Sequence, residues 1–268
     1  MKDVIAWELK RRRKIMFWWS LGTIIMTTMI VALYPSIRDQ AAQMNQVINE
    51  LPKGLREMKA GTAGTVNVGD PLQFLNSQLF YATLPIMWII LAITRGSSVL
   101  GREEQDKTLE ILLSQPISRT RLLFAKAISL MIELLVVGAV CCVILIVLGP
   151  VFDLDIGASR IMGASLLTAL FSLSFGYIAF ALQAASSLTR RGATTIAVIL
   201  SFGGYILVSL SGLTDWLDTP VKFFPYHYFA PLDTLEGHFP TGIVIYLVAT
   251  FLIGTLLAII GFRRRDIG

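Results

Sequence analysis

Residues Ala127–Val151 read AISLMIELLVVGAVCCVILIVLGPV, and this stretch decides the fold class. It carries a single charged residue, Glu133, and a helix of this length rises about 37 Å at 1.5 Å per residue. The hydrocarbon core of a bilayer is roughly 30 Å thick, so the stretch is long enough to cross it. Because a backbone in lipid must satisfy its own hydrogen bonds, the stretch predicts a transmembrane helix.

Similar apolar runs recur along the whole chain. Hydrophobic residues make up 54% of it and charged residues 15%, and the mean hydropathy is +0.67, values outside those of soluble globular proteins. We therefore predict an all-α polytopic membrane protein with one transmembrane domain over residues 1–268. The first run is too long for a cleaved signal peptide and should remain as a span. The six expected transmembrane helices are Ile15–Pro35, Leu79–Val99, Ala127–Val151, Arg160–Leu188, Thr194–Leu213 and Thr241–Phe262.

The basic residues predict the orientation in the membrane. With six spans, both termini share one face with the loops 100–126 and 189–193, and that face holds 17 of the 23 Lys and Arg residues. Basic residues are retained on the cytoplasmic side, so both termini are expected in the cytoplasm and the protein in the cytoplasmic membrane. This asymmetry also accounts for the net charge of +5, so nucleic acid is not needed as a partner.

The first 14 residues combine apolar positions with a basic run. Val4, Ile5, Trp7 and Leu9 can face the acyl boundary while the basic residues meet the headgroups of membrane lipid, which predicts an interfacial helix before the first span. A plain topology anchor is the alternative explanation of the same pattern.

The segment 100–126 is a charged, amphipathic insert between two apolar runs. Leu109, Leu112 and Leu113 form one apolar stripe at helical spacing. Pro116 ends that helix, and Ser118 is placed to cap the next one. A helix lying in the headgroups would explain the periodicity, but the acidic residues around the stripe would be repelled by an anionic leaflet. A short helix bounded by a proline break is instead suited to act as a lever on the attached spans.

The wording of this insert resembles the cytoplasmic segment of permease subunits of type-2 ATP-binding-cassette (ABC) exporters. The resemblance implies a coupling helix that lies against an ATPase subunit, and two permease copies, identical or homologous, per transporter. ATP and Mg would bind in that partner, because no G-x-x-x-x-G-K-[ST] phosphate loop occurs here. By resemblance, the coupling residues are Glu103, Glu104, Lys107, Thr108, Leu109, Glu110, Leu112, Leu113, Ser114, Gln115, Pro116, Ser118 and Arg119.

Other parts of the chain carry the same resemblance more weakly. In the family an elbow helix touching the ATPase matches residues 1–14, and an outer loop containing Glu50-Leu51-Pro52 matches residues 36–77. The proline- and aromatic-rich segment Phe224–Pro231, within the outer segment 214–240, matches the sequence before the last span. By resemblance only, Gly203 and Gly204 of the fifth span would approach the dimer axis and the pathway.

The two outer segments also have physical explanations of their own. In the 36–77 loop, Ile37, Ala41, Met44, Ile48, Leu51, Leu55 and Met58 recur at steps of four and three. Such a seam predicts a helix that lies on the membrane or packs on its twin, with a binding platform as the alternative. The aromatic residues of 214–240, from Trp216 to Phe229, suit an interfacial belt or a re-entrant cap over the pathway.

Charged residues within the spans are candidate functional positions. Arg95 and Glu133 are expected at similar depth near the cytoplasmic side, where pairing would remove the cost of two isolated charges. Lys126 is a competing partner that could instead extend to the interface. A structural pair is favoured over a proton relay, because acidic or histidine residues do not form a chain across the membrane.

Catalytic and metal chemistry is not indicated. The sequence has no G-x-S-x-G or H-E-x-x-H motif, and His227 and His238 lack a third ligand at a helical spacing. We therefore expect a transmembrane subunit of an ABC exporter that is not itself an enzyme. The alternatives are a stand-alone channel or secondary carrier, and a membrane sensor that uses its outer loop. The sequence does not identify a substrate.

Overall fold

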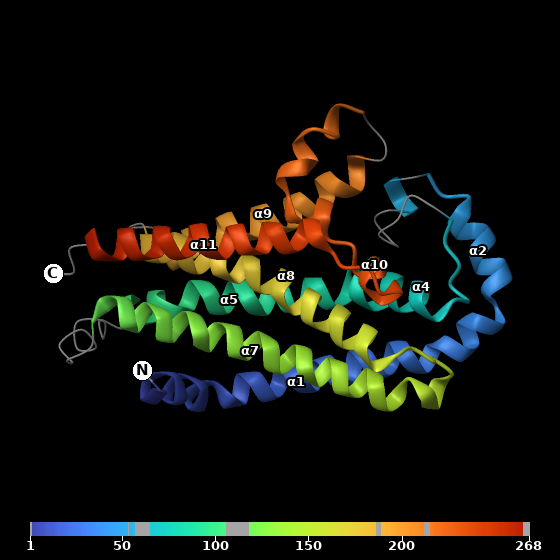
Figure 1. Ribbon diagram of the computed structural model, residues 1–268, viewed down its shortest axis with the longest axis horizontal. Coiled ribbons are helices and arrows are strands. Elements are labelled where there is room, and N and C mark those ends of the chain that lie inside the picture. The colour runs from blue at the N-terminus through green and yellow to red at the C-terminus, as the bar shows by residue number, and fades with distance from the viewer. Residues whose placement is uncertain are drawn as a thin grey trace.

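In a computed structural model, the described residues are 2–52, 54–56, 65–105, 118–185, 189–211 and 215–264. Six of their helices are long and apolar enough to span a membrane, which confirms the predicted number. The six are α1 (Lys2–Asp39), α5 (Thr83–Gln105), α7 (Arg119–Leu148), α8 (Ala158–Ala185), α9 (Arg190–Ser211) and α11 (Thr241–Arg264). Both termini lie at one end of this bundle, as an even number of spans requires (Figure 1). We call this the proximal end and the opposite one the distal end.

Short helices connect the spans. They are α2 (Ala41–Asn49), α4 (Pro71–Leu75), the π-helix η1 (Asn76–Phe80), the 3₁₀ helices η2 (Pro150–Phe152), η3 (Asp215–Leu217), η4 (Pro220–Phe223) and η5 (Pro225–Tyr228), and α10 (Pro231–Glu236). In Figure 1, α2, α4 and α10 all lie at the distal end. Prolines begin several of these elements, because their missing N–H group is not needed at the first helical position.

Helix α8 is the centre of the bundle. It packs against α5, α7, α9 and α11, and 78% of its most apolar window is buried, against 22% for α1 and for α11. Its small residues explain this position, since Gly, Ala, Ser and Thr let helices approach closely in a membrane. The buried small residues of α9, among them Ala193, Ala197, Ser201 and Gly204, lie on one face.

The closest helix crossing joins α5 and α8 at two glycines. A Cβ atom on Gly96 would overlap the carbonyl oxygen of Gly176, and one on Gly176 would lie 2.5 Å from the carbonyl oxygen of Ala92. The two backbones are therefore in direct contact, and only glycine fits at either position.

The N-terminal segment is continuous with the first span. Residues 2–14 do not form a helix separate from the first span, because α1 continues from Lys2 to Asp39 without interruption. The segment lacks a proline or glycine that would end a helix before the span begins. Its position relative to a membrane surface stays a prediction.

The 36–77 loop folds back on itself. Ile37, Ala41, Met44 and Ile48 of the predicted seam pack against Val66 and Val68 of the same loop. The Asn45 and Asn49 side chains accept hydrogen bonds of 2.8 Å from the backbone N–H groups of Val68 and Val66. Part of the seam is thus covered by its own chain, and contact of this loop with the membrane or a twin stays a prediction. Leu55 is 43% exposed and takes no part in it, and Met58 lies outside the described residues.

The aromatic segment before the last span divides into two parts. Trp216 and Phe223 are exposed, as an interfacial belt requires. Tyr226 and Phe229 are buried, with Phe229 stacked on Phe171 of α8 at a centroid distance of 3.9 Å. The belt assignment is therefore wrong for these two residues, because the turns of η4 and η5 direct them into the core.

The glycine crossing gives a test of the fold. Gly96→Ala should lower the thermal unfolding midpoint of the purified protein in detergent, because overpacking a tight contact costs about 1–3 kcal/mol. Gly22→Ala on α1 is the matched control, since its nearest neighbour would be Met87 Cε at 4.0 Å. An equal midpoint in the two variants would contradict the close α5–α8 approach.

Candidate functional site: a buried charge cluster

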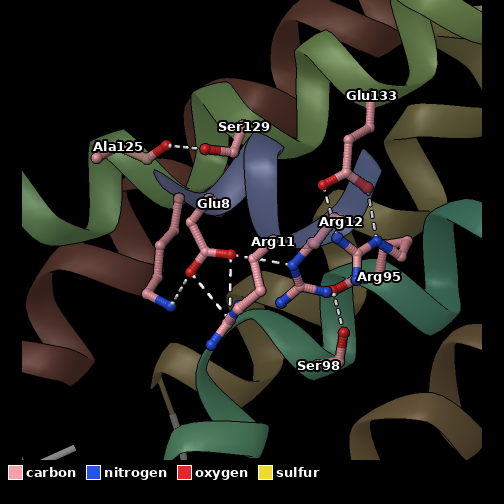
Figure 2. Close-up of polar contacts among 9 residues, drawn as sticks. Glu8, Arg11, Arg12, Arg95, Ser98, Ala125, Ser129 and Glu133 are labelled. Carbon is pink, nitrogen blue, oxygen red and sulfur yellow. Dashed lines mark hydrogen bonds and ion pairs between the residues drawn. The ribbon is translucent and has the colours of Figure 1, made fainter. Parts of the chain in front are cut away.

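Five charged side chains meet at the proximal end of the bundle, between α1, α5 and α7. They are Glu8 and Arg12 from α1, Arg95 from α5, and Lys126 and Glu133 from α7. Each is at most 5% exposed. We refer to these five residues as the charge cluster. Figure 2 shows the guanidinium groups of Arg12 and Arg95 between the carboxylates of Glu8 and Glu133.

The Arg95–Glu133 pair has bidentate geometry. Arg95 Nε donates to Glu133 Oε2 and Arg95 Nη2 donates to Glu133 Oε1, both at 2.6 Å (Figure 2). Two parallel charge-assisted bonds fix both the distance and the orientation of the side chains. The structure therefore contains the pair that the sequence predicts, and it joins α5 to α7.

Glu8 is the acceptor for a second group of bonds. Its carboxylate accepts from Lys126 Nζ at 3.0 Å and from Arg12 Nε at 3.0 Å. Arg11, whose side chain is 32% exposed, adds bonds of 3.2 Å to both oxygens. These contacts join the first turns of α1 to α7.

Lys126 thus corrects one expectation. Its side chain is 1% exposed and bonded to Glu8, so it does not extend to the interface. Its partner Glu8 is not among the predicted site residues. The sequence does contain one indication that Glu8 forms ion pairs: Arg11 and Arg12 follow it at i+3 and i+4, a spacing that favours ion pairs on a helix. Nothing local indicated Lys126, which is 118 residues away.

The cluster holds one more positive than negative charge. Two carboxylates face three cations, and Arg12 Nη2 is buried without a hydrogen-bond partner among the described residues. A cavity of about 10 Å³ lies among these side chains, about the size of one water molecule. The side chains are thus closely packed around one another, and the space between them is too small for an organic substrate. The cluster is suited to holding three helices together.

The predicted coupling segment is only partly described. Residues 106–117, with Lys107, Thr108, Leu109, Glu110, Leu112, Leu113, Ser114, Gln115 and Pro116, lie outside the described residues. Of Glu103 and Glu104 the structure describes the backbone, which belongs to the last turns of α5.

The end of the coupling segment is described and agrees with the sequence. Ser118 caps α7, since its hydroxyl accepts from the Arg121 N–H at 3.3 Å. Arg119 donates to the carbonyl of Phe262 on α11 at 3.5 Å. The two helices that flank residues 106–117, α5 and α7, are the two that Arg95 and Glu133 join.

The two glycines of α9 have different surroundings. A Cβ atom on Gly204 would lie 2.6 Å from Phe224 Cδ1, so this glycine accommodates a ring of its own chain. For Gly203, no described atom beyond its chain neighbours and its own helix backbone lies within 4 Å of the position that a Cβ atom would occupy. Its approach to a dimer axis stays a prediction.

Comparison with known proteins supplies the family. The family model described as ABC-2 family transporter protein matches residues 3–267, nearly the whole chain. Curated proteins give no match.

The charge cluster predicts a large effect on stability. Glu133→Gln should lower the free energy of unfolding by about 3–5 kcal/mol, because it leaves the Arg95 guanidinium buried without its carboxylate. The double variant Arg95→Met/Glu133→Leu should recover most of this loss, since apolar residues of similar volume replace both charges. Thermal unfolding in detergent measures both. A double variant no more stable than the single one would contradict a dominant Arg95–Glu133 contact.

Proposed function

Because the chain belongs to the ABC-2 transporter family, we propose that it is the membrane-spanning subunit of an ABC exporter. A separate nucleotide-binding subunit would hydrolyse ATP, with Mg, and drive the transport. The six spans supply a membrane domain, and this chain carries no phosphate loop of its own. A second permease copy, identical or homologous, would complete the complex.

The observation that carries this proposal is the connection between the coupling segment and the charge cluster. Residues 106–117 join the end of α5 to the start of α7. These two helices are held together by Arg95 and Glu133, and α7 is held to α1 by Lys126 and Glu8. A force applied to the segment by an ATPase would therefore displace α1, α5 and α7 together.

Two further contacts would extend this movement. The backbones of α5 and α8 touch at Gly96 and Gly176, so displacement of α5 is transmitted to the centre of the bundle. Arg119, at the end of the coupling segment, contacts the proximal end of α11 through the carbonyl of Phe262. Packed helices move as rigid elements, and such contacts are the routes by which coupling travels.

In this mechanism the proximal end faces the cytoplasm and substrate moves outward. The excess of basic residues on that face supports the orientation. The protein would then reside in the cytoplasmic membrane with both termini inside the cell. A stand-alone channel or carrier needs no ATPase, and a sensor needs only the outer loop. Recovery of an ATPase with the chain in mild detergent distinguishes the exporter from both.

Charge reversal in the coupling segment tests the mechanism directly. The variant Glu103→Lys/Glu104→Lys/Glu110→Lys should lose ATPase activity that depends on the permease, because it repels the surface that the acidic residues contact. The thermal unfolding midpoint of the membrane domain should remain that of the unmodified chain. ATP hydrolysis by the reconstituted complex measures the first effect.

The matched control is Glu50→Lys/Asp155→Lys/Asp218→Lys. These three residues are exposed in segments outside the coupling segment, and the change in total charge is the same. Coupled ATPase activity should survive in this control. Normal activity in the Glu103/Glu104/Glu110 variant, or equal losses in both, would contradict the coupling role.

A further inference from the structure

A groove opens at the distal end between α8, α10 and the start of α11. Its volume is about 390 Å³, within the roughly 300–1,000 Å³ range of small-molecule sites. Among the described residues that line it, none belongs to the charge cluster or to the coupling segment.

One wall of the groove is apolar and continuous along α8. Leu166, Leu167 and Leu170 line it from α8, and Val244 lines it from α11. Leu166 remains 48% exposed, and Phe239 at the α11 side is 76% exposed. Leu166 belongs to a helix long and apolar enough to span a membrane, and exposed apolar surface on such a helix is suited to contact with lipid hydrocarbon.

The opposite end of the groove is polar and basic. Ser159, Arg160 and His238 line it. Arg160 Nε lies 3.9 Å from the position that a Cβ atom on Gly237 would occupy, which places the guanidinium over the turn that ends α10. His238 Nδ1 is 3.8 Å from the Glu236 carboxylate.

Arg160 carries a charge that the described residues do not compensate. It forms no ion pair or hydrogen bond through its side chain among the residues that the structure describes. It also lies in the first turn of α8, where the helix macrodipole is positive and disfavours a cation. An anionic group at the mouth of the groove would be attracted both by the Arg160 guanidinium and by the positive end of the α8 macrodipole.

The dimensions identify the ligand class. Arg160 and Leu170 are ten residues apart on α8, and ten helical residues rise about 15 Å. This is half of a hydrocarbon core of roughly 30 Å, the depth of one leaflet. A ligand that fills the groove therefore has an anionic head at Arg160 and a chain one leaflet long beside Leu166, Leu170 and Val244.

We propose that this groove binds an anionic phospholipid from the leaflet at the distal end. The phosphate lies at Arg160 and Ser159, and one acyl chain lies along the leucines of α8. This site is separate from the transport function proposed above, and its test does not depend on an ATPase.

Native mass spectrometry of the full chain in detergent tests the proposal. The delipidated protein is titrated with phosphatidylglycerol or with phosphatidylcholine of identical acyl chains. The unmodified chain should bind phosphatidylglycerol about fivefold more tightly, since one basic side chain near an anionic headgroup contributes about that factor. Arg160→Gln should bring the ratio of the two affinities close to one.

Two variants locate the lipid. Lys222→Gln removes an exposed cation from the distal aromatic segment and should retain the fivefold preference. Val244→Trp fills the apolar part of the groove and should weaken binding of both lipids at least fivefold. Arg160→Gln changes an exposed side chain, so it remains informative even if Val244→Trp fails to fold.

Several results would overturn the proposal. An affinity ratio near one in the unmodified chain would do so, as would equal behaviour of Arg160→Gln and Lys222→Gln. A folded Val244→Trp variant with unchanged lipid binding would place the lipid elsewhere. Displacement of the lipid by inorganic phosphate at equal concentration would show that the site recognises an anion without a chain.

Discussion

Two hydrogen bonds of 2.6 Å between Arg95 and Glu133 are the contact on which the proximal half of the molecule depends. Both side chains lie inside a bundle whose surroundings are hydrocarbon, where an unpaired charge is strongly disfavoured. Neither α5 nor α7 can therefore move away from the other without exposing a charge to a medium that does not solvate it. The pair acts as a fixed link between the two helices that flank residues 106–117.

Glu8 extends this link to the first helix. By accepting bonds from both Arg12 and Lys126, it brings the N-terminal turns of α1 against α7. The basic N-terminal segment thus has a structural partner within the bundle. In an ATP-driven transporter this arrangement would make three helices respond as one to a force at the coupling segment.

In the rest of the bundle, the helices are held close by small side chains rather than by ion pairs. The small residues of α8 allow α5, α7, α9 and α11 to pack around it, and at Gly96 and Gly176 the backbones themselves touch. The distal end is built differently, from short proline-initiated helices and from a loop whose backbone is bonded by Asn45 and Asn49. Its groove is bordered by Arg160, the cation that α8 places at that end.

The sequence by itself determined the helical class, the number of spans and the cap at Ser118. These follow from the length of apolar runs and from residue types that act within a few positions of one another. It also indicated the Arg95–Glu133 pair, because two charges at matched depth in lipid have few other partners. Only the tertiary structure decided that Lys126 meets Glu8, that Tyr226 and Phe229 are buried, and that the seam of the outer loop packs on Val66 and Val68. These contacts join residues far apart in the chain or depend on how short turns direct a side chain. The local sequence pattern specifies neither the distant partner nor the direction of the side chain, because a segment with the same pattern can have lipid, water or protein against its apolar face.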